Sequence, residues 1–185
     1  MSDCPIILGI NYGGHDTSAC LTVGGNLIAA CEEERFSKEK HSRDFPINSI
    51  NECLSIAKIT IDEIDEIGFI FDPVHAIREN YLKPALKDEK RIEFLINDIQ
   101  RIKDKYNIEK TIRKKINFKG KFTGHLHHLC HLASSYYPSG FESALLFSND
   151  GMGEIKTSTL AIGKNDEISI VHSGNTYPNS LGLFY

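Results

Sequence analysis

Short apolar runs separated by glycine turns fill the first part of the chain. They predict three β-strands, at residues 5–10, 18–23 and 27–31. Gly24-Gly25-Asn26 supplies the positive-φ positions that a tight reversal needs between the second and third runs. The pattern indicates a three-stranded meander whose first turn, residues 11–16, presents backbone N–H groups beside His15.

The middle of the chain changes to a helical period. Apolar residues on one face predict a helix over 47–58, and a strand at 64–71 follows it. From residue 76 to about 116 the chain is charged and helical, which is typical of an amphipathic cover or insertion, and we assign it no chemistry. Its apolar stripe, which we expect to be buried, comprises Ile92, Leu95, Ile96, Ile99 and Ile102.

The last part of the chain repeats the pattern of apolar runs and glycine turns. A strand at 118–124 leads into a helix that ends at Pro138. Further strands are predicted at 143–148, 157–162 and 167–172. This region therefore repeats the meander of the amino-terminal part.

The two meanders, over 5–34 and 143–172, predict the duplicated lobes of an actin-like (ASKHA, ribonuclease-H-like) nucleotide-binding fold. In this α/β class each lobe has a mixed sheet with flanking helices. We expect a first lobe over residues 1–140, with the helical insertion at about 76–116, and the start of a second lobe over 141–185. No helix follows the helix-start residues near 178–185, so we expect a truncated amino-terminal fragment with an incomplete second lobe.

Composition excludes several classes of protein. A length of 185 residues with 41% hydrophobic content suffices for one full core or two small lobes. The net charge of -4 gives no general reason to expect nucleic acid, and the basic stretch at 113–121 is interpreted as a solvated helix end. The five cysteines have no paired spacing and the N-terminus has no signal sequence, so we expect a reduced, cytoplasmic protein. No apolar run approaches the roughly 20 residues of a membrane span, so we expect no membrane partner.

Residues 127–131 place two imidazoles four residues apart in a predicted helix. Residues i and i+4 lie on one face, so His127 and His131 can reach a single metal ion from the same side. The pattern alone is also compatible with a structural origin, and a metal needs a third protein ligand or oxygens from substrate or water. Cys130 would point about 100° away from His131, so it is interpreted as packing, and His128 is expected to face away from the metal.

An acidic glycine turn follows the strand at 143–148. It contains Asp150, Gly151 and Glu154. An acidic residue beside glycines at a strand end is where backbone can approach a phosphate, and where a carboxylate can meet a metal or its water. This turn is therefore a candidate binding segment.

Five groups of residues occur in an order that is more specific than any one of them. They are 9–11 with 14–19, 32–36 with 40–41, 127–134, 150–151 with 153–154, and 180–185. In this order they resemble the amino-terminal part of the O-carbamoyltransferase family, which includes nodulation-factor and antibiotic carbamoyltransferases. The resemblance covers essentially the whole chain.

The resemblance implies a two-domain enzyme. A carboxy-terminal domain, similar to the synthases that make threonylcarbamoyl-AMP, converts carbamoyl phosphate and ATP to carbamoyl-adenylate, and the actin-like domain moves the carbamoyl group to a hydroxyl of a small-molecule acceptor. In that family the histidines that match His127 and His131 bind a divalent iron, completed by an aspartate further along and by the adenylate. We expect that aspartate and the carboxy-terminal domain to lie outside these residues, and this fragment alone to be inactive.

The same resemblance implies roles in the two glycine turns. His15 matches the family's catalytic histidine, and an imidazole suits a general base at neutral pH. Asp16 is interpreted either as orienting that ring or as a cap. One position departs from the family, since some relatives carry an acid two residues before this histidine, where this chain has Gly13. The candidate adenylate contacts are Asn11, Gly13, Gly14, Asp150 and Gly151.

Other interpretations stay open. A protein that attaches threonylcarbamoyl to tRNA shares the actin-like fold and an H-x-x-x-H site, although tRNA would favour more basic surface than a net charge of -4 provides. A sugar kinase of this fold has no need of a helical histidine pair, and an inactive remnant or binding module is a further alternative. Four loop residues fit either an anionic substrate or a mobile charged loop: Lys38, Lys40, His41 and Arg43.

Overall fold

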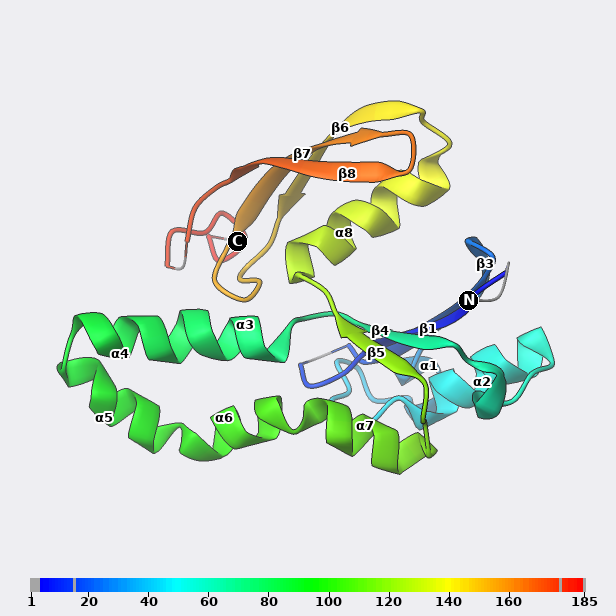
Figure 1. Ribbon diagram of the computed structural model, residues 1–185, viewed down its shortest axis with the longest axis horizontal. Coiled ribbons are helices and arrows are strands. Elements are labelled where there is room, and N and C mark those ends of the chain that lie inside the picture. Colours follow the sequence, from blue (N-terminus) through cyan, green and yellow to red (C-terminus); the bar gives the residue numbers. More distant parts are fainter. Residues whose placement is uncertain (1–3, 15, 177, 185) are drawn as a thin grey trace. The chain divides into compact units, whose positions relative to one another are not determined.

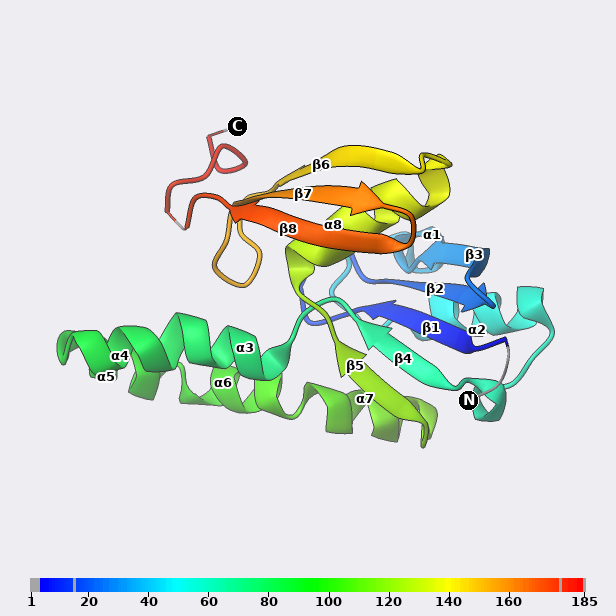
Figure 2. The same ribbon diagram turned by 45° about the horizontal axis from the view of Figure 1, so that its top comes forward.

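The computed structural model describes residues 4–14, 16–176 and 178–184. By its internal packing the chain forms two compact units, residues 1–73 with 99–124 and residues 74–98 with 125–185. Each unit has its own sheet, β1–β5 in the first and β6–β8 in the second (Figure 1; β2 is labelled in Figure 2).

The sheet of the first unit is mixed. Its strands are β1 (Ile6–Asn11), β2 (Ser18–Val23), β3 (Asn26–Glu32), β4 (Glu66–Phe69) and β5 (Lys121–Gly124). They lie in the order β3-β2-β1-β4-β5, in which β1 pairs antiparallel with β2 and parallel with β4 (Figure 2). β3 is antiparallel to β2, and β5 is parallel to β4. The predicted meander and the mixed α/β class are therefore confirmed.

Alternation along the strands forms the core of this unit. Leu8 and Ile10 are buried and lie two residues apart on β1, as the two-residue period of a strand requires. Leu21 of β2 is also buried and pairs with Leu8. The helix α2 (Ile47–Ala57) packs against β2 and β3 and buries Ile50 and Cys53. The predicted helix over 47–58 therefore covers the meander.

A buried carboxylate caps α2, which begins after a proline without a side-chain cap. Glu33, just before the short helix α1 (Glu34–Ser37), is 2% exposed. Its oxygens accept hydrogen bonds from the backbone N–H groups of Asn48 (3.3 Å) and Ser49 (2.9 Å), and from Asn48 Nδ2 (2.6 Å) and Ser49 Oγ (2.8 Å). Burial raises the pKa of Glu33, but these hydrogen bonds more than offset that effect and hold the pKa below its ordinary value.

The charged helical region is broken into segments. They are α3 (Pro73–Ile77), the π-helical η2 (Arg78–Leu82), α4 (Lys83–Lys87), α5 (Lys90–Asn97), α6 (Ile99–Tyr106) and α7 (Ile108–Ile116). The expected buried stripe is wrong, because Ile92, Ile96 and Ile99 are 45%, 61% and 57% exposed. Ile92 and Ile96 lie in the unbroken helix α5, which contacts α4 and η2, and Ile99 follows the non-helical Asp98. The apolar period therefore shows which residues share a face, but not what covers that face.

The second unit has a three-stranded antiparallel sheet in the order β6-β7-β8. Its elements are α8 (His127–Tyr136), β6 (Ser143–Asn149), β7 (Ser158–Lys164) and β8 (Glu167–Ser173). Leu132 and Tyr136 of α8 are buried with Leu146 of β6 and Ala161 of β7. The predicted strands and histidine helix are thus confirmed. The lobe boundary at residue 140 stays a prediction, because packing units and lobes are different divisions.

Two short 3-10 segments, η1 (Ile61–Glu63) and η3 (Tyr137–Ser139), complete the regular structure of the described residues. In that part of the chain no helix has the length and apolar character needed to cross a membrane. The five cysteines carry free thiols. A cytoplasmic location stays a prediction.

We predict that Glu33→Gln lowers the free energy of unfolding by about 1–3 kcal/mol. The glutamine oxygen accepts weaker hydrogen bonds than a carboxylate, and its NH₂ group would face the hydrogen-bond donors at the start of α2, which it cannot bind. Glu32→Gln is the matched control, because the Glu32 side chain is 50% exposed and its pair with Arg35 contributes less than about 1 kcal/mol. Urea unfolding followed by circular dichroism measures both variants. Equal losses would contradict the capping role of Glu33.

The lowered pKa of Glu33 gives this effect a pH dependence. The stabilisation is complete above the unfolded-state pKa of about 4.3 and is lost as the pH falls through the lower folded-state pKa. We therefore expect the stability difference between the wild type and Glu33→Gln to shrink as the pH is lowered from about 6 to about 3. A constant difference would assign the loss to packing instead of charge.

Candidate metal centre

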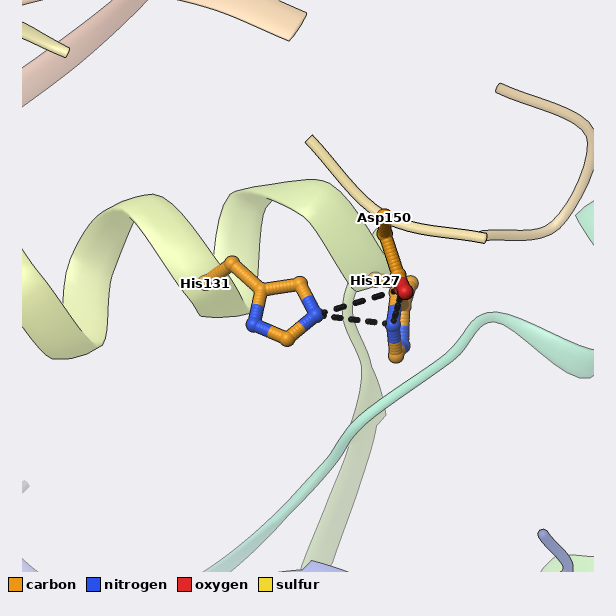
Figure 3. Close-up of side chains that lie close together, drawn as sticks. All are labelled: His127, His131 and Asp150. Carbon is orange, nitrogen blue, oxygen red and sulfur yellow. Dashed lines mark hydrogen bonds and ion pairs between the residues drawn. The ribbon is translucent and has the colours of Figure 1, made fainter. Parts of the chain in front are cut away.

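α8 presents two imidazoles on a face that does not pack against the sheet. His128, Leu132 and Tyr136 are the buried residues of this helix, whereas His127 is half-buried and His131 is exposed. The Nε2 atoms of His127 and His131 lie 2.9 Å apart, and the two rings meet edge to face (Figure 3). The four-residue spacing therefore brings both ring nitrogens to one point.

Asp150 directly follows β6 and points at the same two rings (Figure 3). Its Oδ2 lies 2.8 Å from His127 Nε2 and 3.4 Å from His131 Nε2, while Oδ1 accepts the Gly151 N–H at 2.6 Å. Burial raises the pKa of Asp150, but the hydrogen bonds with His127 and Gly151 and the two imidazoles outweigh that effect and hold the pKa below its usual value. The Asp150 carboxylate, which we expect among the adenylate contacts, lies against the histidine pair.

The three side chains fit a divalent metal ion. Each offers one ligand atom, and these atoms all lie within 4.8 Å of one another. Their separations of 2.8, 2.9 and 3.4 Å are near the ~3.0 Å between neighbouring ligands at right angles, each about 2.1 Å from one ion. Two imidazoles and one carboxylate are also the donor set of the facial triads that bind ferrous iron and leave other positions open.

Glu154 ties the glycine turn after β6 to the start of α8. This helix follows Leu126, which has no capping side chain. The Glu154 carboxylate is buried and accepts the backbone N–H of His127, at 3.0 Å to Oε1 and 3.3 Å to Oε2. A negative group is also favoured at a helix N-terminus by the helix dipole. Glu154 thereby holds the backbone of His127.

His128 ties the same turn to the buried side of α8. The residue is 4% exposed, with Nδ1 2.7 Å from Ser148 Oγ and Nε2 2.8 Å from the Lys156 backbone oxygen. A carbonyl oxygen only accepts, so Nε2 carries a proton and donates it to the Lys156 backbone oxygen. Gly153 packs on this ring, since a Cβ there would lie 2.7 Å from His128 Cδ2. His128 faces the protein interior, as expected.

Two residues near the end of the chain support Asp150. Ser180 Oγ donates a hydrogen bond to the Asp150 backbone oxygen at 2.9 Å. A Cβ on Gly182 would lie 2.5 Å from the Asp150 carbonyl carbon, so only glycine fits at this close approach. Sequence reasoning missed both roles, because these contacts join residues about 30 positions apart and leave no local pattern.

The other predicted site residues belong to the first unit. Asn11 ends β1, and its Nδ2 donates to the Asp16 backbone oxygen at 2.7 Å. Gly13 has a φ of 94°, a conformation that favours glycine. A Cβ on Gly14 would have no neighbour within 4 Å in the described part of the chain. His15 lies outside the described residues, and its catalytic role and the adenylate contacts stay predictions.

The fold and the cluster define a mixed α/β protein with a candidate centre of two histidines and one carboxylate. The sequence profile of the family described as carbamoyltransferase N-terminus matches residues 6–185. The chain therefore belongs to the carbamoyltransferase N-terminal family, which confirms the resemblance.

Relatives of this chain are considerably longer. An uncharacterized protein of Synechocystis is 33% identical over 190 residues, which cover 97% of this chain and 30% of that protein. The nodulation protein NolNO of Sinorhizobium fredii is 31% identical over 176 residues, covering 92% of this chain and 24% of that protein. The chain thus spans less than a third of either relative. YeaZ from Pseudomonas aeruginosa aligns with 94% of this chain and 68% of its own at 12% identity and a TM-score of 0.48, a likeness too low to carry an argument.

We predict that Gly153→Ala lowers the free energy of unfolding by about 1–3 kcal/mol, because its Cβ would overlap the His128 ring at 2.7 Å. Gly151→Ala is the matched control in the same turn, since its Cβ would make ordinary contact with Leu183 at 3.5 Å and should change stability by less than about 0.5 kcal/mol. Neither glycine has a positive φ, so backbone strain does not enter the comparison. Scanning calorimetry measures both, and comparable losses would contradict the packing of this turn on His128.

Proposed function

We propose that this chain is the amino-terminal part of an O-carbamoyltransferase, which moves a carbamoyl group from carbamoyl-adenylate to a hydroxyl of a small-molecule acceptor. Membership of the carbamoyltransferase N-terminal family supports the transferase class. The observation that carries the proposal is the convergence of His127, His131 and Asp150, because such a transfer needs a positive centre near the carbonyl and phosphate oxygens. Carbamoyl phosphate and ATP are the proposed sources of the adenylate, in a further synthase-like domain.

The proposed reaction replaces one carbon–oxygen bond by another. The acceptor oxygen bonds to the carbamoyl carbon, and AMP leaves with the electron pair of the bond that joined that carbon to its phosphate oxygen. His15 is the proposed base that takes the hydroxyl proton. Asn11, Gly13, Gly14 and Gly151 remain the proposed adenylate contacts, while we reassign Asp150 to the metal.

A divalent ion, proposed to be ferrous iron, would supply positive charge for the oxygens that become more negative during transfer. His127 and His131 from α8 and Asp150 after β6 are the residues that would hold it. Glu154 and His128 would fix the positions of these ligands, which is the usual task of residues behind a metal site.

We also propose the finer fold of the domain. The first unit would be the core of the first lobe of an actin-like, ribonuclease-H-like domain, and β6–β8 would begin the second lobe. The strand order β3-β2-β1-β4-β5, in which β2 alone runs opposite to the other four strands, supports this assignment.

We predict that His131→Ala and Asp150→Asn each weaken the binding of Fe²⁺ or Co²⁺ by more than about 100-fold, since each removes one of three protein ligands. His172→Ala is the matched control, because His172 is an exposed histidine on β8 outside the cluster. The metal affinity of this variant should stay within about twofold of the wild-type value. Anaerobic calorimetry and the visible spectrum of the Co²⁺ form measure binding, and thermal melts confirm that the variants are folded. Unchanged affinity in His131→Ala would overturn the metal centre.

A second prediction tests the proposed base in a longer chain that carries the adenylate-forming domain. We expect His15→Asn to lower carbamoyl transfer by about 10²–10⁴-fold with little effect on adenylate formation, because a general base acts where the hydroxyl proton leaves. Pyrophosphate release and mass spectrometry of the carbamoylated product follow the two steps separately. Equal losses in both steps would give His15 a structural role, and a product formed by residues 1–185 alone would overturn the need for a second domain.

A further inference from the structure

A groove in the first unit lies where two parallel strands end. It has a volume of about 630 Å³ and is lined by Tyr12 and Gly14 after β1, Phe71 after β4, Arg43, and Arg101 and Lys105 of α6. We call it the α6 groove. In sheets with parallel strands, ligands bind outside the carboxyl ends of the strands, which is where this groove lies.

The α6 groove is positively charged although the chain as a whole is negative. Arg43, Arg101 and Lys105 line it, and Asp104 is the one acidic residue among its lining side chains in the described chain. The net charge of the protein is -4, so this grouping of cations runs against the average charge of the surface. A concave surface with an excess of one sign of charge raises the local concentration of ligands of the opposite sign.

The rest of the groove suits a compact, ring-sized molecule. Tyr12 and Phe71 contribute aromatic surface, and Lys105 Nζ lies 4.9 Å from the centre of the Phe71 ring. The groove is open at Gly14, because a Cβ on this residue would have no described neighbour within 4 Å. The volume falls within the range of about 300–1,000 Å³ that is typical of small-molecule sites.

We propose that the α6 groove binds the acceptor of the transfer, and that this acceptor is a hydroxylated small molecule that carries a phosphate or carboxylate group. The inference rests on the proposed carbamoyltransferase function. Arg43 and Arg101 bind the acidic group, since guanidinium groups match the geometry of phosphate and carboxylate oxygens. The hydroxyl end then lies beside Gly14, a proposed adenylate contact, where acceptor and adenylate would meet, and Gly14 directly precedes His15 in the sequence. Acceptors rich in amines are disfavoured by the same positive charges.

The test is a calorimetric titration of the 185-residue chain with glucose 6-phosphate, glucuronate and uncharged glucose. We expect at least one of the two acids to bind about tenfold or more tightly than glucose, and the comparison of the acids decides between phosphate and carboxylate. Arg43→Gln and Arg101→Gln should each weaken binding of the tighter acid by about tenfold. Lys103→Gln removes a charge from the exposed face of the same helix and is the matched control, with less than about a twofold effect.

Several results would overturn the inference. Equal binding of glucose and both acids, or an equal loss in Lys103→Gln and Arg101→Gln, would mean that the groove does not select an acidic ligand. Displacement of the acid by a ten-nucleotide RNA at lower concentration would assign the groove to nucleic acid. Metal binding at Asp150 is measured in the same samples, so loss of the proposed function and loss of this inference give different results. Thermal melts verify that each variant is folded.

Discussion

The candidate metal centre depends on the attachment of the turn at 150–156 to the first turn of α8. Glu154 accepts the backbone N–H of His127, and His128 reaches back to Ser148 and to the Lys156 backbone oxygen. The first contact holds the start of the helix, and the second holds its buried face. Separating the turn from α8 would leave buried polar groups without partners, at about 1–3 kcal/mol for each group. These contacts keep a carboxylate beside the histidine pair.

Buried glutamates cap two helices in this chain, and both lie in segments that carry the family resemblance. Glu33 holds the start of α2, and Glu154 holds the start of α8. In each case the residue before the helix, Pro46 or Leu126, has no capping side chain. A cap from another element also fixes where the helix lies, in addition to its stability. Acidic residues in such motifs are therefore not all available for chemistry.

The hydrophobic pattern located most elements because strands such as β1 and β6, and the helices α2 and α8, each bury one face. Leu8 and Ile10 alternate as a strand requires, and Ile50 and Cys53 follow a helical period. The same reasoning failed for the stripe containing Ile96, because a helical period shows which residues share a face but not whether another element covers it. The helix caps supplied by Glu33 and Glu154 could not be predicted either, because a local pattern carries no information about a partner far along the chain.

At the candidate metal centre, too, a local pattern predicts only the contacts between residues that are close in the sequence. The spacing of His127 and His131 brings their rings together through local geometry, whereas Asp150 is 23 residues from His127 and is aimed by tertiary contacts. Its position has a chemical consequence. His127 Nε2 and Asp150 Oδ2 lie 2.8 Å apart, so the proposed ion would take the place of the hydrogen bond between them. Because imidazole and carboxylate ligands must be deprotonated to bind a metal, binding of the proposed ion would become weaker in acid.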